Sequence, residues 1–282
     1  MTWWKKPTGI KRKRGKNKPV DRDDIERKLN SLKEFISGFK KAGVAFSGGT
    51  DSTLLLKVCL EVLGPEKVRA FTALSPLVPR KEQEEARRLS RLLQVKDHRF
   101  LEVPSLTTYP FRHNTFDRCY HCKGEIYDRF QGELKAVDNN IPLLEGTNRE
   151  DLEDYRPGLE AARERRACFP LVEAGMGKEE VREAARFLGL PNWNKPAQAC
   201  LASRIPYGEE ITLNKLCQVE EGERFLQELG FFNCRLRHHG SWARLEIPRE
   251  KQKALLKRGE EIKGYIQKLG FDKVVLDLEG RK

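Results

Sequence analysis

The chain has 282 residues, enough for one large domain and a smaller one. Charged residues make up 34% and hydrophobic residues 38%, with no apolar run of the roughly 20 residues that a bilayer helix needs, which excludes a membrane-spanning protein. Eight Lys and Arg residues in residues 1–20 supply much of the net charge of +12, so this segment is expected to be a disordered basic tail, and nucleic acid is not an expected partner.

From residue 21 to about residue 205, short apolar runs alternate with segments of helical spacing. Helices are expected at residues 21–40, 51–63, 80–93, 120–137 and 178–188. Strands are expected at residues 43–46, 68–74, 98–103 and 142–145, with loops at residues 104–117 and 146–158. Strands joined by such helices are parallel, so the pattern predicts an α/β fold with a doubly wound parallel sheet.

The pattern changes after residue 206. Helices are expected at residues 212–229 and 250–269, and strands at residues 231–237, 242–247 and 273–278. Hairpin-linked strands between helices predict a separate α+β unit. The expected organisation is therefore a tail (1–20), a nucleotide-binding domain (21–205) and a smaller domain for substrate binding or oligomerisation (206–282).

The strongest local signal is the turn Ser47-Gly48-Gly49-Thr50, called the glycine turn below, between an expected strand and an expected helix. Glycines let the backbone approach a ligand closely, and a helix N-terminus presents free N–H groups to a phosphate. There is no Gly-Lys-Ser/Thr ending, which disfavours transfer of a γ-phosphate. Residues expected to bind nucleotide or Mg²⁺ here are Ala45, Ser47, Gly48, Gly49, Asp51 and Ser52.

The seven cysteines form the second signal. Residues 1–20 lack the apolar run of a secretory signal, so the protein is expected to be cytoplasmic, with thiols or metal ligands rather than disulfides. Cys119 and Cys122 stand at the start of an expected helix, at a spacing that can hold a metal or cluster. A further ligand would come from Cys168 or Cys200. The remaining three, in apolar or amphipathic surroundings, are expected to be core residues: Cys59, Cys217 and Cys234.

These features combine into a family resemblance. Residues 47–52 resemble the ATP pyrophosphatase loop, whose enzymes cleave ATP to AMP and pyrophosphate. Over residues 22–282 the chain resembles the LarE family, the ATP-dependent sulfur transferases of the nickel-pincer nucleotide pathway, which supplies the cofactor of lactate racemase. The segments that carry the resemblance are residues 47–52, 118–123, 145–158, 170–175 and 196–208.

The resemblance implies a reaction and its participants. A carboxylate of pyridinium-3,5-biscarboxylic acid mononucleotide would attack ATP, with Mg²⁺ bound, to form an acyl adenylate. Sulfur from sulfide or another donor would then displace AMP, because a mixed anhydride accepts a sulfur nucleophile whereas a carboxylate does not. The resemblance also implies a homo-oligomer, a trimer or a hexamer.

Family members differ in their source of sulfur. In one type the cysteine at the position of Cys200 gives up its own sulfur, and in another three cysteines hold a [4Fe-4S] cluster with one iron open to hydrosulfide. The sequence favours the cluster on Cys119, Cys122 and Cys200, since a sacrificial donor would not need the first two.

Further roles follow from the resemblance. It implies that Arg118 and Gly146 bind the nucleotide, and that Thr72 faces adenine. Phosphate-holding arginines are expected at Arg204, Arg235 and Arg237, and a catalytic carboxylate at Glu223. Asp151 and Asp154 would orient substrate or Mg²⁺, while Glu150 replaces the aspartate usual in the family.

Two other hypotheses stay open from the sequence. A related pyrophosphatase-loop enzyme could thiolate tRNA, with the basic tail of residues 1–20 holding the RNA. A basic nucleic-acid-binding protein that uses ATP only structurally would release no pyrophosphate with any small carboxylate.

Overall fold

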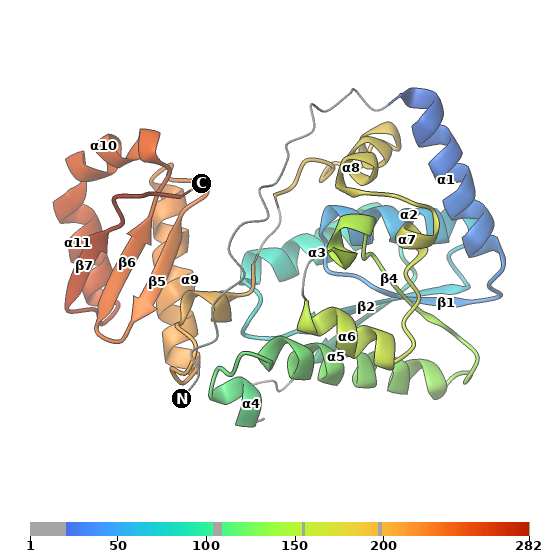
Figure 1. Ribbon diagram of the computed structural model, residues 1–282, viewed down its shortest axis with the longest axis horizontal. Helices are drawn as coiled ribbons and strands as arrows, with labels where there is room; N and C mark the ends of the chain where they lie inside the picture. The colour runs from blue at the N-terminus through green and yellow to red at the C-terminus, as the bar shows by residue number, and fades with distance from the viewer. Residues whose placement is uncertain (1–20, 104–108, 154–155, 197–198, 282) are drawn as a thin grey trace, which may run out of the picture.

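The computed structural model describes residues 21–103, 109–153, 156–196 and 199–281. Figure 1 shows two lobes, a large one that contains a four-stranded sheet and a small one that contains a three-stranded sheet. In the described ranges, none of the helices combines the length and the apolar character needed to cross a bilayer. The basic tail falls outside the described residues.

The large lobe confirms the predicted α/β fold with a parallel sheet. Its strands lie in the order β3-β2-β1-β4, and every pair is parallel. Their bounds are β1 Ala42–Ala45, β2 Val68–Leu74, β3 Asp97–Glu102 and β4 Leu143–Glu145. Strand order reverses at β1, because β2 and β4 flank it, and ligands of such sheets bind beyond the carboxyl ends of the strands at this point.

Helices cover both faces of this sheet (Figure 1). One face carries α1 Arg22–Ser37, α2 Thr50–Leu63, α3 Arg80–Leu92 and α8 Lys178–Phe187, and the other carries α5 Arg118–Lys135 and α6 Pro157–Glu164. Leu54, Leu55 and Leu56 are fully buried in the core of the first face. Phe71 and Phe130 stack at 5.2 Å in the core of the second face. The burial of both faces explains why the strands read as continuous apolar runs.

The small lobe is built on β5 Arg235–His239, β6 Trp242–Glu246 and β7 Lys273–Leu276, with β5 and β6 antiparallel and β6 and β7 parallel. Its helices are α9 Leu213–Glu228, α10 Arg249–Lys257 and α11 Gly259–Lys268. Leu236 and Leu245 pack toward α9 and α11, and a Cβ on Gly222 would lie 2.3 Å from Leu236 Cδ1. Because strand residues alternate between faces, the other face carries Arg235, Arg237, Arg244 and Glu246.

Several sequence predictions differ from the structure. The helix predicted at residues 250–269 is two helices, because Arg258 leaves helical geometry at ψ 19°. The strand predicted from residue 231 begins at Arg235, since Asn233 adopts a positive φ of 60°. Four short elements were not predicted: α4 Tyr109–Arg112, η2 Arg149–Leu152, α7 Pro170–Glu173 and η3 Leu201–Arg204. The helix α6 also begins inside the loop predicted at residues 146–158.

The cysteine predictions are only partly correct. Cys59 and Cys234 are buried as expected, but Cys217 is exposed on α9, where amphipathic spacing had suggested a core position. The core of the small lobe also includes Leu77 and Phe111 from the large lobe's part of the chain. The boundary between residues 205 and 206 therefore stays a prediction.

Candidate active site

The glycine turn lies between β1 and α2. Gly48 has a φ of +73°, and a Cβ there would lie 3.1 Å from Ala86 Cα, so this position requires glycine for both conformation and space. Gly49 is the N-cap of α2 and has no side chain to cap the helix. The first N–H groups of α2 are therefore available to an anion at the point where the helix dipole is positive.

Hydroxyl groups fix the shape of the turn. The Ser52 hydroxyl accepts a hydrogen bond from the Ser47 amide at 3.3 Å and lies 3.2 Å from the Ser47 hydroxyl. The Gly49 amide donates to the Ser47 hydroxyl at 3.3 Å, and the Thr53 hydroxyl donates to the Gly49 carbonyl at 2.8 Å. The turn is thus organised before a ligand arrives, and two hydroxyls stand beside its amides.

A second segment supports the turn from outside. The Asn192 amide donates to the Gly48 carbonyl at 3.1 Å, and the Lys195 ammonium donates to the same carbonyl at 3.3 Å. Lys195 also pairs with Glu82 at 2.7 Å. The segment 192–195 therefore places a cation next to the phosphate-binding backbone. Sequence reasoning missed this lysine, which lies in the chain near residues 199–204, called the Cys200 loop below, and far from residues 47–52.

Gly146 follows β4 and packs against the start of α2. A Cβ there would lie 2.8 Å from the Ser52 amide nitrogen and 2.9 Å from the Asp51 carbonyl carbon. Two residues later, Asn148 donates to Asp51 Oδ1 at 2.8 Å. Burial raises the pKa of Asp51, an effect that the Asn148 hydrogen bond opposes. Gly146 thus lets the backbone after β4 approach the backbone at the start of α2. The Asn148 hydrogen bond holds the Asp51 side chain in the first turn of that helix.

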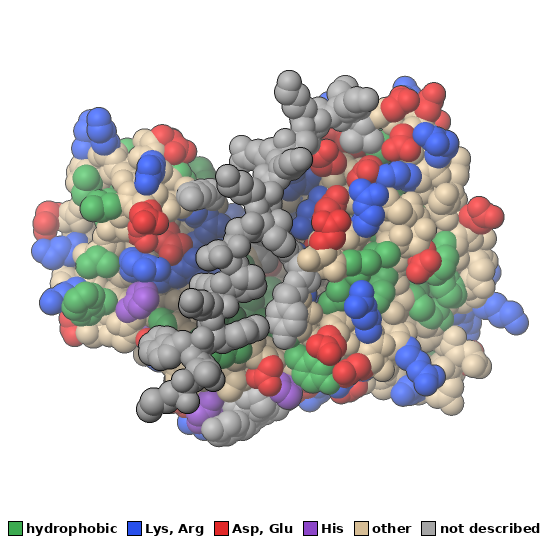
Figure 2. All heavy atoms as spheres, in the orientation of Figure 1, with side chains coloured by type: hydrophobic (Ala, Val, Ile, Leu, Met, Phe, Trp, Pro, Cys, Tyr) green, Lys and Arg blue, Asp and Glu red, His purple; other side chains and the backbone are tan. Residues whose placement is uncertain are grey.

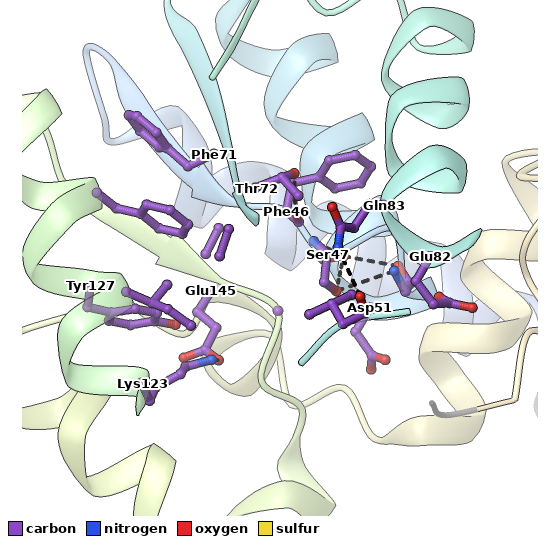
Figure 3. A pocket seen from close by; sticks show the side chains of 18 residues that line it. Phe46, Ser47, Asp51, Phe71, Thr72, Glu82, Gln83, Lys123, Tyr127 and Glu145 are labelled. Carbon is purple, nitrogen blue, oxygen red and sulfur yellow. Dashed lines mark hydrogen bonds and ion pairs between the residues drawn. The ribbon is translucent and has the colours of Figure 1, made fainter. Parts of the chain in front are cut away.

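A cavity of about 300 Å³ opens in front of the glycine turn (Figure 3). The predicted site residues that line it are Ala45, Ser47, Gly49, Asp51, Ser52, Thr72 and Gly146. Phe71, Tyr127 and Phe130 form part of its wall. A phosphate-binding turn beside a wall of aromatic rings suits a nucleotide, because the rings can pack against a flat base.

Thr72 lines the cavity, but its hydroxyl already makes hydrogen bonds within the protein. It donates to the Phe46 carbonyl at 2.5 Å and lies 2.8 Å from His98 Nε2. Burial, followed by repulsion from Arg87, lowers the pKa of His98 to about 4, so the imidazole is neutral at pH 7. Thr72 thus positions the ends of β1 and β2, and its predicted contact with adenine stays a prediction.

A charged group that sequence reasoning missed stands on the other side of the cavity. The Lys123 ammonium donates to Glu145 Oε1 at 2.5 Å and lies 4.8 Å from the centre of the Tyr127 ring. Burial, followed by the Glu145 charge, raises the pKa of Tyr127 well above its usual value. Figure 3 shows Lys123, Tyr127 and Glu145 opposite Ser47 and Asp51. The sequence signal was present, because Lys123 directly follows Cys122 on α5.

Arg204, Arg235 and Arg237, called the arginine cluster below, meet where η3 touches β5. Arg204 forms a double ion pair with Glu223 at 2.9 and 3.0 Å, and its side chain is only 1% exposed. It also donates to the Ala199 and Cys200 carbonyls at 2.7 and 3.0 Å. In this structure Arg204 therefore holds the Cys200 loop and a buried carboxylate.

The other two arginines extend from the polar face of the small sheet. Arg235 lies 3.7 Å from Glu223 Oε2, and burial together with repulsion from Arg204 lowers its pKa to about 10. Arg237 pairs with Glu246 through two contacts of 2.9 Å and donates to the Ser203 carbonyl at 2.7 Å. The small sheet is thus tied to the Cys200 loop by charged side chains.

The three predicted cluster ligands differ in exposure. Cys119 and Cys200 are exposed at the surface, yet the protein atoms around the Cys200 sulfur raise its pKa, and Cys119 adds to this effect. Cys122 is half-buried and packs against the core of the small lobe. Within the described ranges, no three His, Cys, Asp or Glu side chains form a preassembled metal site. Cys168 packs against the core of the large lobe, where burial raises its pKa.

Comparisons with known proteins agree with this geometry. Residues 25–115 match the NAD synthase family. The chain is 37% identical to pyridinium-3,5-bisthiocarboxylic acid mononucleotide synthase of Lactiplantibacillus plantarum, over 90% of this chain and 91% of that protein. The chain belongs to the LarE family. Uncharacterised proteins of Synechocystis sp. and Methanocaldococcus jannaschii are 40% and 29% identical, over 91% and 89% of this chain.

Membership of the LarE family, with the NAD synthase match, identifies an ATP-using enzyme of the pyrophosphatase-loop type. Among the residues that the family resemblance had implied, Arg118 does not line the cavity. It is buried, donates to Asn114 at 2.5 Å and lies 4.2 Å from the Tyr207 ring centre.

The remaining LarE-implied positions lie in the segment after β4. Asp151 closes a capping box with Asn148 and pairs with Arg156 and Lys178 at 3.0 and 3.2 Å. Glu150 accepts a hydrogen bond from the Lys178 amide, so this departure from the family's usual aspartate has a structural partner. Asp154 lies outside the described residues.

Proposed function

We propose that the chain is an ATP-dependent sulfur transferase that converts pyridinium-3,5-biscarboxylic acid mononucleotide to its thiocarboxylate. One observation carries the proposal. Residues 192–196 contact the glycine turn through Asn192 and Lys195, and residues 199–204 include Arg204 of the arginine cluster. Neighbouring parts of the chain therefore contact the phosphate-binding turn and carry Cys200 and Arg204. The arginine cluster is suited to an anionic substrate.

In the first step, a substrate carboxylate oxygen attacks the α-phosphorus of ATP. The new P–O bond forms as the bond to the bridging oxygen breaks, and pyrophosphate leaves with that electron pair. The amides of the glycine turn and the Ser47 and Ser52 hydroxyls would hold the departing phosphates, with Lys195 adding positive charge. Asp51, at the start of α2, would hold Mg²⁺ against the same oxygens.

In the second step, a sulfur nucleophile attacks the carbonyl carbon of the acyl adenylate. The C–S bond forms, the C–O bond to AMP breaks, and AMP leaves as a phosphate anion. Adenylation must come first, because a free carboxylate has no comparable leaving group. Lys123 lies beside Glu145 in the cavity. Its positive charge would stabilise the negative charge that develops on the acyl adenylate when sulfur attacks and AMP leaves.

For the source of sulfur we infer a [4Fe-4S] cluster on Cys119, Cys122 and Cys200. The donor set fits chemically, since iron–sulfur clusters are held by thiolates and all three proposed ligands are cysteine thiols. Cys122 is one helical turn from Cys119 on α5. Such a cluster, when bound, would supply an iron that carries hydrosulfide. Sacrifice of Cys200 is the alternative, and its exposure at the surface is compatible with both.

The reaction is tested by supplying the purified protein with ATP, Mg²⁺, sulfide and the pyridinium substrate under anaerobic conditions. We expect one AMP and one pyrophosphate for each carboxylate converted. Cys200→Ser should still release pyrophosphate in a first round but form no thiocarboxylate. Absence of AMP from the wild-type protein would refute the proposed function.

The sulfur source is tested separately. Anaerobic preparations of the wild type should contain iron and sulfide with the absorption of a cluster, and Cys119→Ala should lose both. If the wild type contains no iron, and mass spectrometry shows that turnover removes the sulfur of Cys200, then Cys200 is a sacrificial donor and the cluster assignment is wrong.

A further inference from the structure

The polar face of the small sheet carries more positive than negative charge. Two more guanidiniums lie beside the arginine cluster, which makes five in all. Arg244 shares Glu246 with Arg237, and Arg281 contacts Asn233, two residues before Arg235. The carboxylates around them are those of Glu223, Glu246 and Asp277. Five positive and three negative groups leave two positive charges. Figure 2 shows basic side chains gathered on the side of the small lobe that borders the large lobe.

The residues that the structure describes do not use all of this hydrogen-bonding capacity. Among them, Arg244 Nε is buried and has no hydrogen-bond partner, and it lies 3.7 Å from a carboxylate oxygen of Asp277. Arg235 makes no side-chain hydrogen bond to any residue that the structure describes, although it is only 7% exposed. Buried donors without partners are destabilising unless a ligand satisfies them. The face is therefore arranged for an anion.

A specific turn brings the C-terminal end of the chain to this face. Figure 1 shows the segment after β7 returning across the small lobe toward the large one. The Arg281 amide donates to the Ile247 carbonyl at 3.0 Å, and Arg249 Nε donates to the Glu279 carbonyl at 2.7 Å. Gln252 donates to the Asp277 carbonyl at 2.9 Å. Residues 277–281 are thus held by three independent contacts.

Gly280 makes this turn possible. Its φ is +69°, and a Cβ there would lie 2.8 Å from the Ile247 carbonyl oxygen and 2.9 Å from Arg249 Cγ. A residue with a side chain would be strained and would also clash with backbone. The turn therefore sets the position of the residue that follows, which is Arg281.

The Arg281 side chain points back toward the arginine cluster. Its Nε donates to Asn233 Oδ1 at 2.6 Å, just ahead of β5. Its two terminal nitrogens have no hydrogen-bond partner among the residues described. Burial, and then repulsion from Arg204, lowers the pKa of Arg281. Within the part of the chain that the structure describes, Arg281 thus presents a fixed and unused pair of donors near the start of β5, which carries Arg235 and Arg237.

We propose that Arg281, delivered by the C-terminal turn, is a substrate-binding residue that holds the phosphate of the pyridinium mononucleotide together with the arginine cluster. The proposal rests on the function proposed above. A phosphate monoester carries a charge of about −1.5 to −2 at pH 7, which matches the excess of two positive charges on this face. A guanidinium fork with both terminal nitrogens free can bind two phosphate oxygens at once.

The test compares binding of the mononucleotide with binding of its dephosphorylated nucleoside, by titration calorimetry without ATP. The wild type should bind the mononucleotide much more tightly than the nucleoside. Arg281→Ala should weaken mononucleotide binding by about 10- to 100-fold, the effect of losing charge-assisted hydrogen bonds, and leave nucleoside binding unchanged. Arg281→Lys, which keeps the charge without the fork, should fall between. Arg258→Ala removes an arginine paired with Glu261 on α11 and should match the wild type.

Each outcome separates this inference from the function on which it rests. If the wild type prefers the mononucleotide and Arg281→Ala keeps that preference, Arg281 does not hold the phosphate, and the proposed function stands. If the wild type binds neither compound, or binds both equally, the assigned substrate is itself wrong. An equal loss of affinity for both compounds in Arg281→Ala would indicate a structural role and would also overturn the inference.

Discussion

The glycine turn and the arginine cluster are built by different physical means. The turn uses backbone amides, two serine hydroxyls and a helix terminus. Hydrogen bonds among the residues of the segment 47–53 hold it in shape. The arginine cluster consists of long charged side chains from η3 and β5, held by Glu223 and Glu246. The hydrogen bonds that shape the first lie within one short segment, although Asn192 and Lys195 support it from outside, whereas the second exists only when two separate parts of the chain have packed together.

This difference predicts where each region is vulnerable. A backbone site fails when a side chain is added, because its geometry depends on space. A charged side-chain site fails when a partner is neutralised, because buried charges are then left without compensation. Substitutions in the two regions should therefore differ in the size of their effects and in whether stability or ligand binding changes more.

The largest effect is expected from Glu223→Gln. Glu223 is 5% exposed, pairs with Arg204 at 2.9 Å and lies 3.7 Å from Arg235. Removing its charge leaves two buried guanidiniums without a counter-charge, which should lower the free energy of unfolding by about 3–5 kcal/mol. Urea denaturation followed by circular dichroism measures this change.

The matched control is Glu261→Gln on α11. Glu261 pairs with Arg258 at 2.8 Å at the surface, so the loss should be at most about 1 kcal/mol. Equal losses in the two variants would mean that Glu223 does not stabilise the arginine cluster. A stable Glu223→Gln protein without activity would instead support the catalytic role that the sequence predicted for this carboxylate.

The next effect is expected from Gly146→Ala. The new Cβ would lie 2.8 Å from the Ser52 amide nitrogen, so α2 must move away from β4. Overpacking of this kind lowers the free energy of unfolding by about 1–3 kcal/mol. Because the displaced backbone belongs to the phosphate-binding helix end, release of pyrophosphate from ATP should fall by more than the stability change explains. Thermal unfolding and a pyrophosphate assay measure the two effects.

Gly132→Ala on α5 provides the comparison. No heavy atom lies within 4 Å of a Cβ at that position, and alanine favours the helix by up to about 1 kcal/mol. The control should therefore be at least as stable as the wild type and fully active. If Gly146→Ala behaves in the same way, the close approach of the two backbones is not required for the site.

A smaller effect is expected from Thr72→Val, which keeps the shape of the side chain but removes its hydroxyl. The Phe46 carbonyl loses a donor and His98 loses a partner, which should lower the free energy of unfolding by about 1–2 kcal/mol. If the hydroxyl also contacts adenine, the KM for ATP should rise while the turnover number stays the same. An unchanged KM would restrict Thr72 to its structural role.

The same comparison explains what the sequence could predict. The parallel sheet followed from strands and helices that alternate along the chain, and the strand expected at residues 68–74 is β2 residue for residue. Five of the residues named from the segment 45–52 line one cavity, because neighbouring residues at a strand end share a position in space, while Thr72 and Gly146 reach it from other strands. Their binding of nucleotide stays a prediction.

Contacts between distant segments could not be predicted in this way. Lys195 reaches Gly48 across 147 positions, and Asn148 reaches Asp51 across 97. Neither pairing has a local sequence signal. The pairing of Arg204 with Glu223 is similar, since each had been given a separate role while the structure joins them. Cys217 illustrates another limit, because helical spacing alone does not determine which face of α9 is covered.

The smallest predicted effect concerns pH and the exposed side of the arginine cluster. Glu246 is partly buried, which opposes ionisation, but its hydrogen bonds and ion pairs with Arg237 and Arg244 prevail and lower its pKa. Its folded pKa lies below the unfolded value, so the stabilisation is complete above the unfolded pKa near 4.3 and is lost as pH falls through the folded pKa. The midpoint temperature of thermal unfolding should therefore fall less steeply between pH 7 and pH 3 in Glu246→Gln than in the wild type. The control is Glu260→Gln, at a side chain that is 93% exposed, which should keep the wild-type dependence on pH. If Glu246→Gln keeps it as well, the ion pairs of Glu246 with Arg237 and Arg244 do not stabilise the fold.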